Sequence, residues 1–179
     1  MKVWRIYTSF LQKYPVWGQI VTTGTLNGMG DVIAQQVVER RGSDHNIMRT
    51  LRMTTIGFCL TGPALVVWYR FLDRIIKPPL KHIPLRKLLC DQTVFSPCIL
   101  ATIFTTASLL EGKNFAQIQR KFQRDYLSAL GNSYKFWPAA QIITFYFMPT
   151  QFRVPYVGVA SLFWNTYLAW ITNKSINHG

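Results

Sequence analysis

Charged residues are bunched along this chain, and the stretches between them are long and carry no charge. Five such stretches of 17 to 20 residues lie between Lys13 and Asp31, Arg52 and Arg70, Asp91 and Glu111, Lys135 and Arg153, and Arg153 and Lys174. A helix needs roughly 20 residues to cross the hydrocarbon core of a bilayer. The pattern therefore predicts an all-α, polytopic membrane helix bundle that occupies residues 1–179 as a single domain.

The last two stretches decide how many spans are expected. Pro149 and Pro155 flank Arg153, which predicts a turn there. Only ten residues separate Pro138 from Pro149, about 15 Å of helix, which is too short to cross. Either this helix begins near residue 130, with Lys135 reaching toward the head groups, or it is a half-span. About four transmembrane helices are expected, with a further helix in 138–173, and five spans are the alternative.

Two connections have the pattern of amphipathic surface helices. Residues 1–14 combine basic side chains with apolar ones at helical spacing, namely Trp4, Tyr7, Leu11 and Tyr14. Pro15 then suits the first turn of the following span. Residues 114–130 place apolar side chains near one face with Arg120, Lys121 and Arg124 around it, although a solvated loop helix fits that segment as well.

Composition agrees with a membrane protein and narrows its partners. Charged residues make up 15% and hydrophobic residues 49%, whereas soluble domains carry about 25% charged residues. The net charge is +13, and the basic residues divide evenly between the two sides of the membrane, which leaves the orientation open. We expect them to meet anionic lipid head groups. No nucleic-acid-binding module accompanies the charge, so direct nucleic-acid binding is not expected. Residues 1–30 resemble no secretory signal, and their basic, acid-free composition is weakly compatible with mitochondrial import.

Four residues of the first span share one helical face. Gly24, Gly28, Asp31 and Gln35 follow one another at steps of four, three and four. Small residues such as these glycines and Gly30 let a second backbone approach closely. A carboxylate at membrane depth needs a partner or water. The face is either the polar lining of a solute path or a helix-packing surface with one satisfied carboxylate.

The later spans carry further polar residues. The third span is expected to begin with Asp91 and Gln92, where Asp91 caps the helix or meets a basic residue, and to kink or start near Pro97. Thr102 follows on the same helix. Gln141, Arg153 and Asn165 lie at or near membrane depth in the C-terminal part, where such groups line a path or join helices.

No enzyme signature is present in the sequence. The three histidines lie in connections or the tail without metal-ligand spacing, and no phosphate-binding loop occurs, so neither catalysis nor a metal or other cofactor is expected. Cys59, Cys90 and Cys98 are read first as buried, inert thiols, with redox control as the alternative.

Several motifs identify a family resemblance over nearly the whole chain. The C-terminal group comprises Trp137-Pro138, Gln141, Phe145, Pro149, Arg153, Trp164-Asn165 and Tyr167-Leu168. Earlier ones are Tyr14-Pro15, Gly28-x-Gly30-Asp31 with Gln35, Trp68-Tyr69 with Leu72-Asp73, and Asp91-Gln92 with Pro97. Their order and spacing are similar to those of the Mpv-seventeen / 22-kDa peroxisomal membrane protein family, and most similar to its mitochondrial branch. Thr144 and Met148 are local departures.

The resemblance implies a small integral protein of an organelle membrane, usually with four spans. It implies the mitochondrial inner membrane, with the peroxisomal membrane as the alternative. Members are associated with non-selective channel activity, membrane homeostasis, the mitochondrial nucleotide pool, mitochondrial DNA maintenance and reactive-oxygen metabolism.

Two hypotheses follow for function. In the first, the bundle turns Asp31, Gln35, Thr102, Gln141 and Asn165 inward around a weakly selective path for small hydrophilic solutes or ions, and Asp31 and Asp91 tune ion preference. One bundle leaves little room for a path, so the path can require a homo-oligomer. In the second, the protein is a membrane scaffold or assembly factor that holds partners through its basic loops and surface helices.

Overall fold

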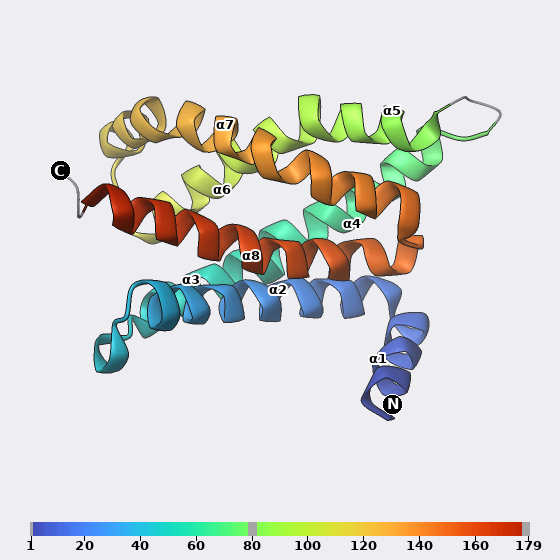
Figure 1. Ribbon diagram of the computed structural model, residues 1–179, viewed down its shortest axis with the longest axis horizontal. Coiled ribbons are helices and arrows are strands. Elements are labelled where there is room, and N and C mark those ends of the chain that lie inside the picture. Colours follow the sequence, from blue (N-terminus) through green and yellow to red (C-terminus); the bar gives the residue numbers. More distant parts are fainter. Residues whose placement is uncertain (1, 79–81, 177–179) are drawn as a thin grey trace.

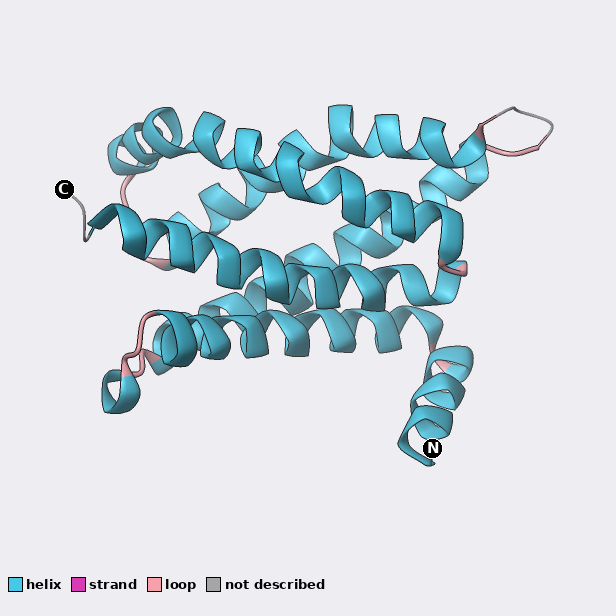
Figure 2. Ribbon diagram, in the orientation of Figure 1, coloured by secondary structure: helices cyan, strands magenta, loops and turns pink. Residues whose placement is uncertain are grey.

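The computed structural model describes residues 2–78 and 82–176, and the side chains of residues 5–78 and 82–166. Helix accounts for nearly all of the described chain, and no strand occurs in it (Figure 2). This confirms the all-α prediction.

Long helical rods run back and forth along one axis (Figure 1). The first comprises α2 (Pro15–Ile33) and a π-helical turn, η1 (Ala34–Val38). The second comprises α3 (Ile47–Ile56), the π-helical η3 (Gly57–Thr61) and α4 (Gly62–Ile75). The third comprises α5 (Ile83–Cys90), the π-helical η4 (Asp91–Phe95) and α6 (Ser96–Leu110). The last two rods are α7 (Phe115–Phe147) and α8 (Thr150–Ile176). A short 3-10 turn, η2 (Gly42–Asp44), lies between the first two rods.

Two of these rods are long and apolar enough to cross a membrane. They are Ile47–Ile75, with mean hydropathy 1.3, and Ile83–Leu110, with mean hydropathy 1.7. Only 17% of the most apolar window of the second rod is buried within the chain, so its large exposed side chains need cover outside this bundle. The described residues thus provide two candidate spans, and the expected total of four stays a prediction.

The N-terminal helix α1 (Lys2–Lys13) lies at one end of the bundle and leaves it at a steep angle (Figure 1). Leu11 is fully buried against Gly18, and the hydroxyl of Tyr7 lies 3.1 Å from that of Thr22. Pro15 occupies the first turn of α2, as the sequence predicted. The apolar face of α1 is therefore partly occupied by α2, and not wholly available to a membrane surface.

The third rod and α7 both begin earlier than the charge pattern indicated. The helical path toward α6 starts at Ile83, so Asp91 lies well inside it and does not cap it. Pro97 sits in the first turn of α6, just after the π-helical turn. Helix α7 continues through Pro138 from an Asn114 cap, which accepts a hydrogen bond from the backbone of Gln117. The expected surface helix at 114–130 and the following span are therefore one helix.

The turn between α7 and α8 lies at Met148 and Pro149. Met148 is extended, as residues before proline usually are. Pro155 lies within α8, so the sequence-based expectation that it bounds the turn was wrong. The main hydrophobic core sits near this end of the bundle, where side chains of α4, of the residue that follows it, and of α7 and α8 meet: Leu65, Val66, Tyr69, Leu72, Ile76, Phe145, Val154 and Val157.

Candidate functional site: a cavity along the bundle

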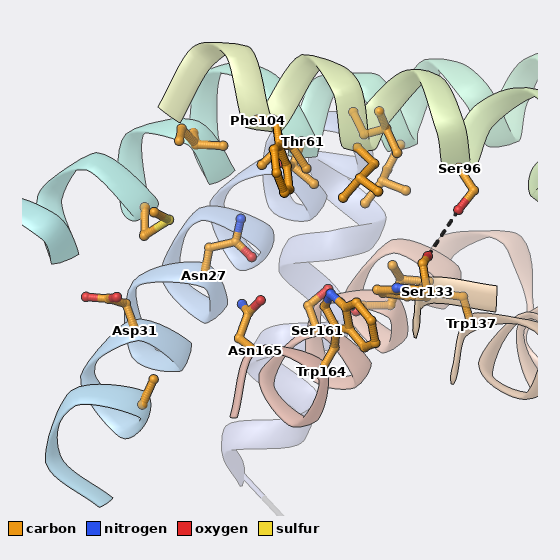
Figure 3. A pocket seen from close by; sticks show the side chains of 18 of the residues that line it. Asn27, Asp31, Thr61, Ser96, Phe104, Ser133, Trp137, Ser161, Trp164 and Asn165 are labelled. Atoms are coloured by element: carbon orange, nitrogen blue, oxygen red, sulfur yellow. Dashed lines mark hydrogen bonds between the residues drawn. The ribbon is translucent and has the colours of Figure 1, made fainter. Parts of the chain in front are cut away.

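A cavity of about 570 Å³ lies between the helices (Figure 3). This volume is within the range of small-molecule sites. Its wall combines charged, polar and aromatic groups with an apolar strip from α6. The lining residues include Asn27, Asp31, Glu39, Arg41, Arg49, Thr61, Asp91, Ser96, Ile99, Leu100, Ile103, Phe104, Ser133, Trp137, Gln141, Ser161, Trp164 and Asn165.

One end of the cavity is formed by a cluster of ion pairs. Arg49 lies at the centre, with Nε 2.7 Å from Oδ1 of Asp31 and Nη1 2.6 Å from Oε1 of Glu39. Nε of Arg41 lies 2.6 Å from the other oxygen of Glu39. Two cations and two carboxylates thus meet here, and their formal charges cancel.

Asp31 is the most enclosed member of this cluster, with a side chain 4% exposed. Its Oδ2 accepts hydrogen bonds of 2.7 Å from Nε2 of Gln35 and from the hydroxyl of Thr50. Gln35 is completely buried and also accepts a hydrogen bond from the backbone of Asn46. Asp31 is thus a satisfied carboxylate that also lines a cavity, so both sequence-based readings apply to it. Neutralising it would alter helix contacts and cavity charge together.

Glu39 lies just after the end of the first rod and forms ion pairs with both cations of this cluster, Arg49 and Arg41. Burial alone would raise the pKa of Glu39, but hydrogen bonds and charge from Arg49 and Arg41 outweigh burial and hold that pKa below its ordinary value. Glu39 therefore keeps its ion pairs with Arg49 and Arg41 at neutral pH.

The glycines of α2 bring the next helix close to the cavity. Gly24 faces the ring of Phe58, and a Cβ at Gly57 would lie 2.7 Å from Cα of Gly24. Gly28 faces Thr54 one turn further on. Gly30 faces α8 instead, where a Cβ would meet Leu162 at 3.2 Å. Gly24, Gly28, Asp31 and Gln35 therefore all face the α3–η3 segment, on the single helical face that their spacing predicted.

The other end of the cavity is formed around Asp91 in η4. Its carboxylate accepts hydrogen bonds from Nε1 of Trp68 at 2.9 Å, Nε2 of Gln141 at 2.9 Å and Nε2 of Gln92 at 3.1 Å. Asp91 is 2% exposed, and no Lys or Arg within the described chain forms an ion pair with it. The sequence-based expectation of a basic partner was therefore wrong, because neutral donors satisfy this carboxyl group.

Aromatic and hydroxyl groups form the wall between these ends. The rings of Trp137 and Trp164 lie 6.3 Å apart, and the hydroxyls of Ser96 and Ser133 are 3.4 Å apart (Figure 3). The hydroxyl oxygen of Thr61 is buried and has no hydrogen-bond partner among the described residues. A polar group in that state is placed to bond a water molecule or a solute.

Not every polar residue singled out from the sequence lines the cavity. Gln92 is half-buried and helps to hold Asp91, and Gln35 holds Asp31 from outside the wall. Thr102 is exposed and donates to the carbonyl of Cys98, so its expected inward position was wrong. Cys59 and Cys98 are also exposed, contrary to the expectation of buried thiols. Cys90 is half-buried.

A second ion-pair cluster joins α4, α5 and α8 at the far end of the bundle. Nη1 of Arg153 lies 2.7 Å and 2.9 Å from the two carboxylate oxygens of Asp73, which also pairs with Lys87. The guanidinium of Arg153 lies over the ring of Phe145. Hence Leu72-Asp73, Phe145 and Arg153 meet in space although they are far apart in sequence. Tyr167 and Leu168 belong to α8 but lie outside the residues whose side chains are described.

Sequence reasoning did not find the basic half of the charged cluster. Arg41 and Arg49 lie in and just after the connection between the first two rods, where basic residues are ordinary and carry no special signal. Within the described residues, no three His, Cys, Asp or Glu side chains are grouped so that they could hold a metal ion. The described residues of the site thus form a polar and aromatic cavity.

The described residues define the class of a small, all-helical protein with two helical rods long and apolar enough to cross a membrane. A sequence profile described as the Mpv17 / PMP22 family matches residues 108–169. "Mitochondrial inner membrane protein Mpv17" of Xenopus laevis is 46% identical over 97% of this chain and 98% of its own length. The protein of the same name in Homo sapiens is 40% identical over 97% of this chain and 99% of its own length. "Protein sym-1" of Neurospora crassa is 36% identical over 94% of this chain and 98% of its own length.

This chain belongs to the Mpv17 / PMP22 family, and its location is the mitochondrial inner membrane. No solved structure matches the chain. The comparisons confirm the family resemblance and the location predicted from the motifs.

Proposed function

We propose that this protein is a weakly selective channel for small hydrophilic solutes or ions, and not an enzyme. The observation that carries the proposal is the cavity, which follows the bundle axis between two polar ends. Asp91 and Phe104 both line it and are 13 positions apart on one helical rod, which corresponds to about 20 Å at 1.5 Å per residue. That length is about two-thirds of a hydrocarbon core of roughly 30 Å.

The character of the wall supports transit better than tight binding. Paired ions at one end and single hydroxyl or amide groups along the wall offer weak, separated contacts, which conduction requires. The hydroxyl of Thr61, which has no hydrogen-bond partner among the described residues, supports hydration of the middle section of the cavity.

We propose that α2, α7 and α8 lie in the membrane beside the two apolar rods, which gives five spans if all three cross and four if one of them does not. The basic connections would then contact anionic head groups on both sides of the membrane. The exposed side of α6 offers a surface for lipid or for a second copy, so a homo-oligomer is part of the proposal. Solute flux of this kind would contribute to homeostasis of the membrane potential, the nucleotide pool and mitochondrial DNA, as the family resemblance implies.

The proposal is tested by flux from liposomes that contain purified protein. Vesicles loaded with potassium and a nucleotide should lose both faster than vesicles without protein. Charge reversal of Arg120 and Arg124 on the exposed first half of α7 should leave that flux unchanged, because neither residue lines the cavity. Folded, inserted protein that gives no flux would contradict the channel.

A scaffold is the second candidate, and one observation favours it. The first half of α7 carries Phe115, 81% exposed, and Leu127, 74% exposed, beside exposed Arg120 and Arg124. Lys121 is less available, since it lies over the ring of Phe104 and near Glu111. A scaffold would lose its bound partners upon charge reversal of Arg120 and Arg124 and would give no flux in any variant.

A further inference from the structure

A second cavity, of about 420 Å³, lies toward the end of the bundle opposite the charged cluster. Its lining comes from the starts of α2 and α8 and from α4: Pro15, Gln19, Val66, Tyr69, Arg70, Pro149, Thr150 and Gln151. Figure 1 shows the starts of α2 and α8 at one end of the bundle and the start of α3 at the other. Several lining residues are exposed, so this cavity opens to the outside of the protein.

Gln19 is a buried polar residue of this cavity that lacks a partner. It is 7% exposed, and its side-chain amide forms no hydrogen bond with any described residue. The hydroxyl of Tyr69, in contrast, is already engaged, because it accepts a hydrogen bond of 3.0 Å from Nε2 of Gln141. Buried amide groups are nearly always hydrogen-bonded. Gln19 is therefore placed to bond a group that enters the cavity.

Arg70 brings a positive charge without a counter-charge to the same wall. No Asp or Glu of the described chain lies within ion-pair distance of its guanidinium. Thr150 donates a hydrogen bond to Asp73, but that carboxylate is already paired with Arg153 and Lys87. The described lining residues include no carboxylate of their own. The cavity therefore favours an anion, and it offers nothing to pair with the ammonium group of a zwitterionic molecule.

Two helix N-termini also meet at this cavity. Helix α2 has 19 residues and begins at Pro15, and helix α8 has 27 residues and begins at Thr150. The first turn of a helix carries N–H groups that have no partner within the helix, and the aligned peptide dipoles favour negative charge there. A guanidinium, an amide without a partner and two helix N-termini together provide donors for an oxyanion such as a phosphate group.

The surroundings of the cavity favour a lipid as the source of this phosphate group. Arg70 lies five residues before the end of the apolar rod Ile47–Ile75, about 8 Å along the helix, and can reach the level of the head groups. Aromatic side chains gather at that level in membrane proteins. Four of them are exposed at the ends of the neighbouring helices, namely Tyr14, Trp17, Tyr146 and Phe147. A lipid would contact both the donors and this apolar rim, whereas a soluble phosphate would contact only the donors.

We propose that the second cavity binds the head group of an anionic glycerophospholipid, and that Arg70 and Gln19 recognise it. The phosphate would lie between the guanidinium of Arg70 and the starts of α2 and α8, while Gln19 would bond a phosphate or glycerol oxygen from the inner side. Basic pockets between transmembrane helices bind lipid head groups in this way. The inference does not depend on the proposed channel function, because the two cavities share no lining residue.

The test is native mass spectrometry of the purified protein in detergent with dioleoyl-phosphatidylglycerol or dioleoyl-phosphatidylcholine. The wild type should bind phosphatidylglycerol at least about fivefold more tightly than phosphatidylcholine, because only the anionic lipid matches the charge. Its affinity should fall at least about fivefold in Arg70→Ala and about threefold in Gln19→Leu, through the loss of one charged and one neutral donor. Arg86→Ala is the matched control, since Arg86 is exposed and lines neither cavity, and it should bind like the wild type.

Melting temperatures show whether the variants are folded. Arg70 is exposed and Gln19→Leu removes an amide without a partner, so neither variant should melt below the wild type without lipid. Added phosphatidylglycerol should raise the melting temperature of the wild type and of Arg86→Ala, but not of Arg70→Ala.

Three results would overturn the proposal. The first is equal affinity of the wild type for the two lipids, and the second is equal affinity of the wild type and Arg70→Ala for phosphatidylglycerol. The third is displacement of phosphatidylglycerol by an equal concentration of sn-glycerol 3-phosphate, which carries the phosphate without acyl chains. That displacement would assign the cavity to a soluble phosphate compound.

Discussion

Replacing Arg49 with alanine should destabilise the protein by about 3 kcal/mol, the cost typical of removing one partner from a buried ion pair. Among the described residues, Arg49 is the only cation that forms an ion pair with Asp31, and it also forms an ion pair with Glu39. Without it, a carboxylate 4% exposed keeps only the neutral donors Gln35 and Thr50. The measurement is the melting temperature of the protein in detergent, monitored by tryptophan fluorescence. This temperature should fall by several degrees.

Arg49→Lys serves as a graded variant, because a single ammonium group cannot reproduce two separate guanidinium contacts. Its melting temperature should lie between those of the wild type and Arg49→Ala. Arg120→Ala is the control, since Arg120 is exposed and lines no cavity. Equal melting temperatures for Arg49→Ala and Arg120→Ala would show that the ion pairs with Asp31 and Glu39 contribute nothing.

Replacing Gly57 should have the second large effect, by forcing two helices apart. A Cβ at Gly57 would stand 2.7 Å from Cα of Gly24 and 2.9 Å from the side-chain nitrogen of Asn27. Backbone atoms cannot rotate away as a side chain can, so Gly57→Ala should cost about 2 kcal/mol and Gly57→Val more. The check is again the melting temperature, together with the yield of monodisperse protein.

Gly131→Ala is the matched control for that substitution. Gly131 lies within α7, and nothing stands within 4 Å of the position of its Cβ. Alanine there should raise stability by up to about 1 kcal/mol through its helix propensity. If Gly57→Ala behaved like Gly131→Ala, the close approach of α2 and η3 would be absent in the folded protein.

Local spacing predicted the polar face of the first rod but not what it contacts. Gly24, Gly28, Asp31 and Gln35 lie on one face because α-helical geometry places residues three or four apart together. Their partners come from α3 and η3, and such pairing depends on how the rods pack. The sequence therefore indicated that Asp31 needs a partner without showing that Arg49 provides it.

The boundaries of the rods were less predictable from the sequence, because each charged residue was expected to mark the end of a membrane span. Asp91 lies inside its rod since Trp68, Gln92 and Gln141 satisfy the carboxyl group, and these contacts form only in the folded bundle. Pro138 likewise lies inside α7, where the sequence suggested a boundary. The motif residues Trp68-Tyr69, Asp91-Gln92 and Gln141 were recognised singly, and the structure shows them as one hydrogen-bonded group.

The central claim is that solutes move through the cavity along the bundle, and filling that cavity tests it most directly. Leu100 lines the cavity from α6, whereas Leu109 lies on the same helix, is 59% exposed and lines no cavity. Single-channel conductance should fall at least about twofold in Leu100→Trp, because the larger ring narrows the path, and should be unchanged in Leu109→Trp. Equal conductance in Leu100→Trp and the wild type, with both proteins folded and inserted, would place the path elsewhere.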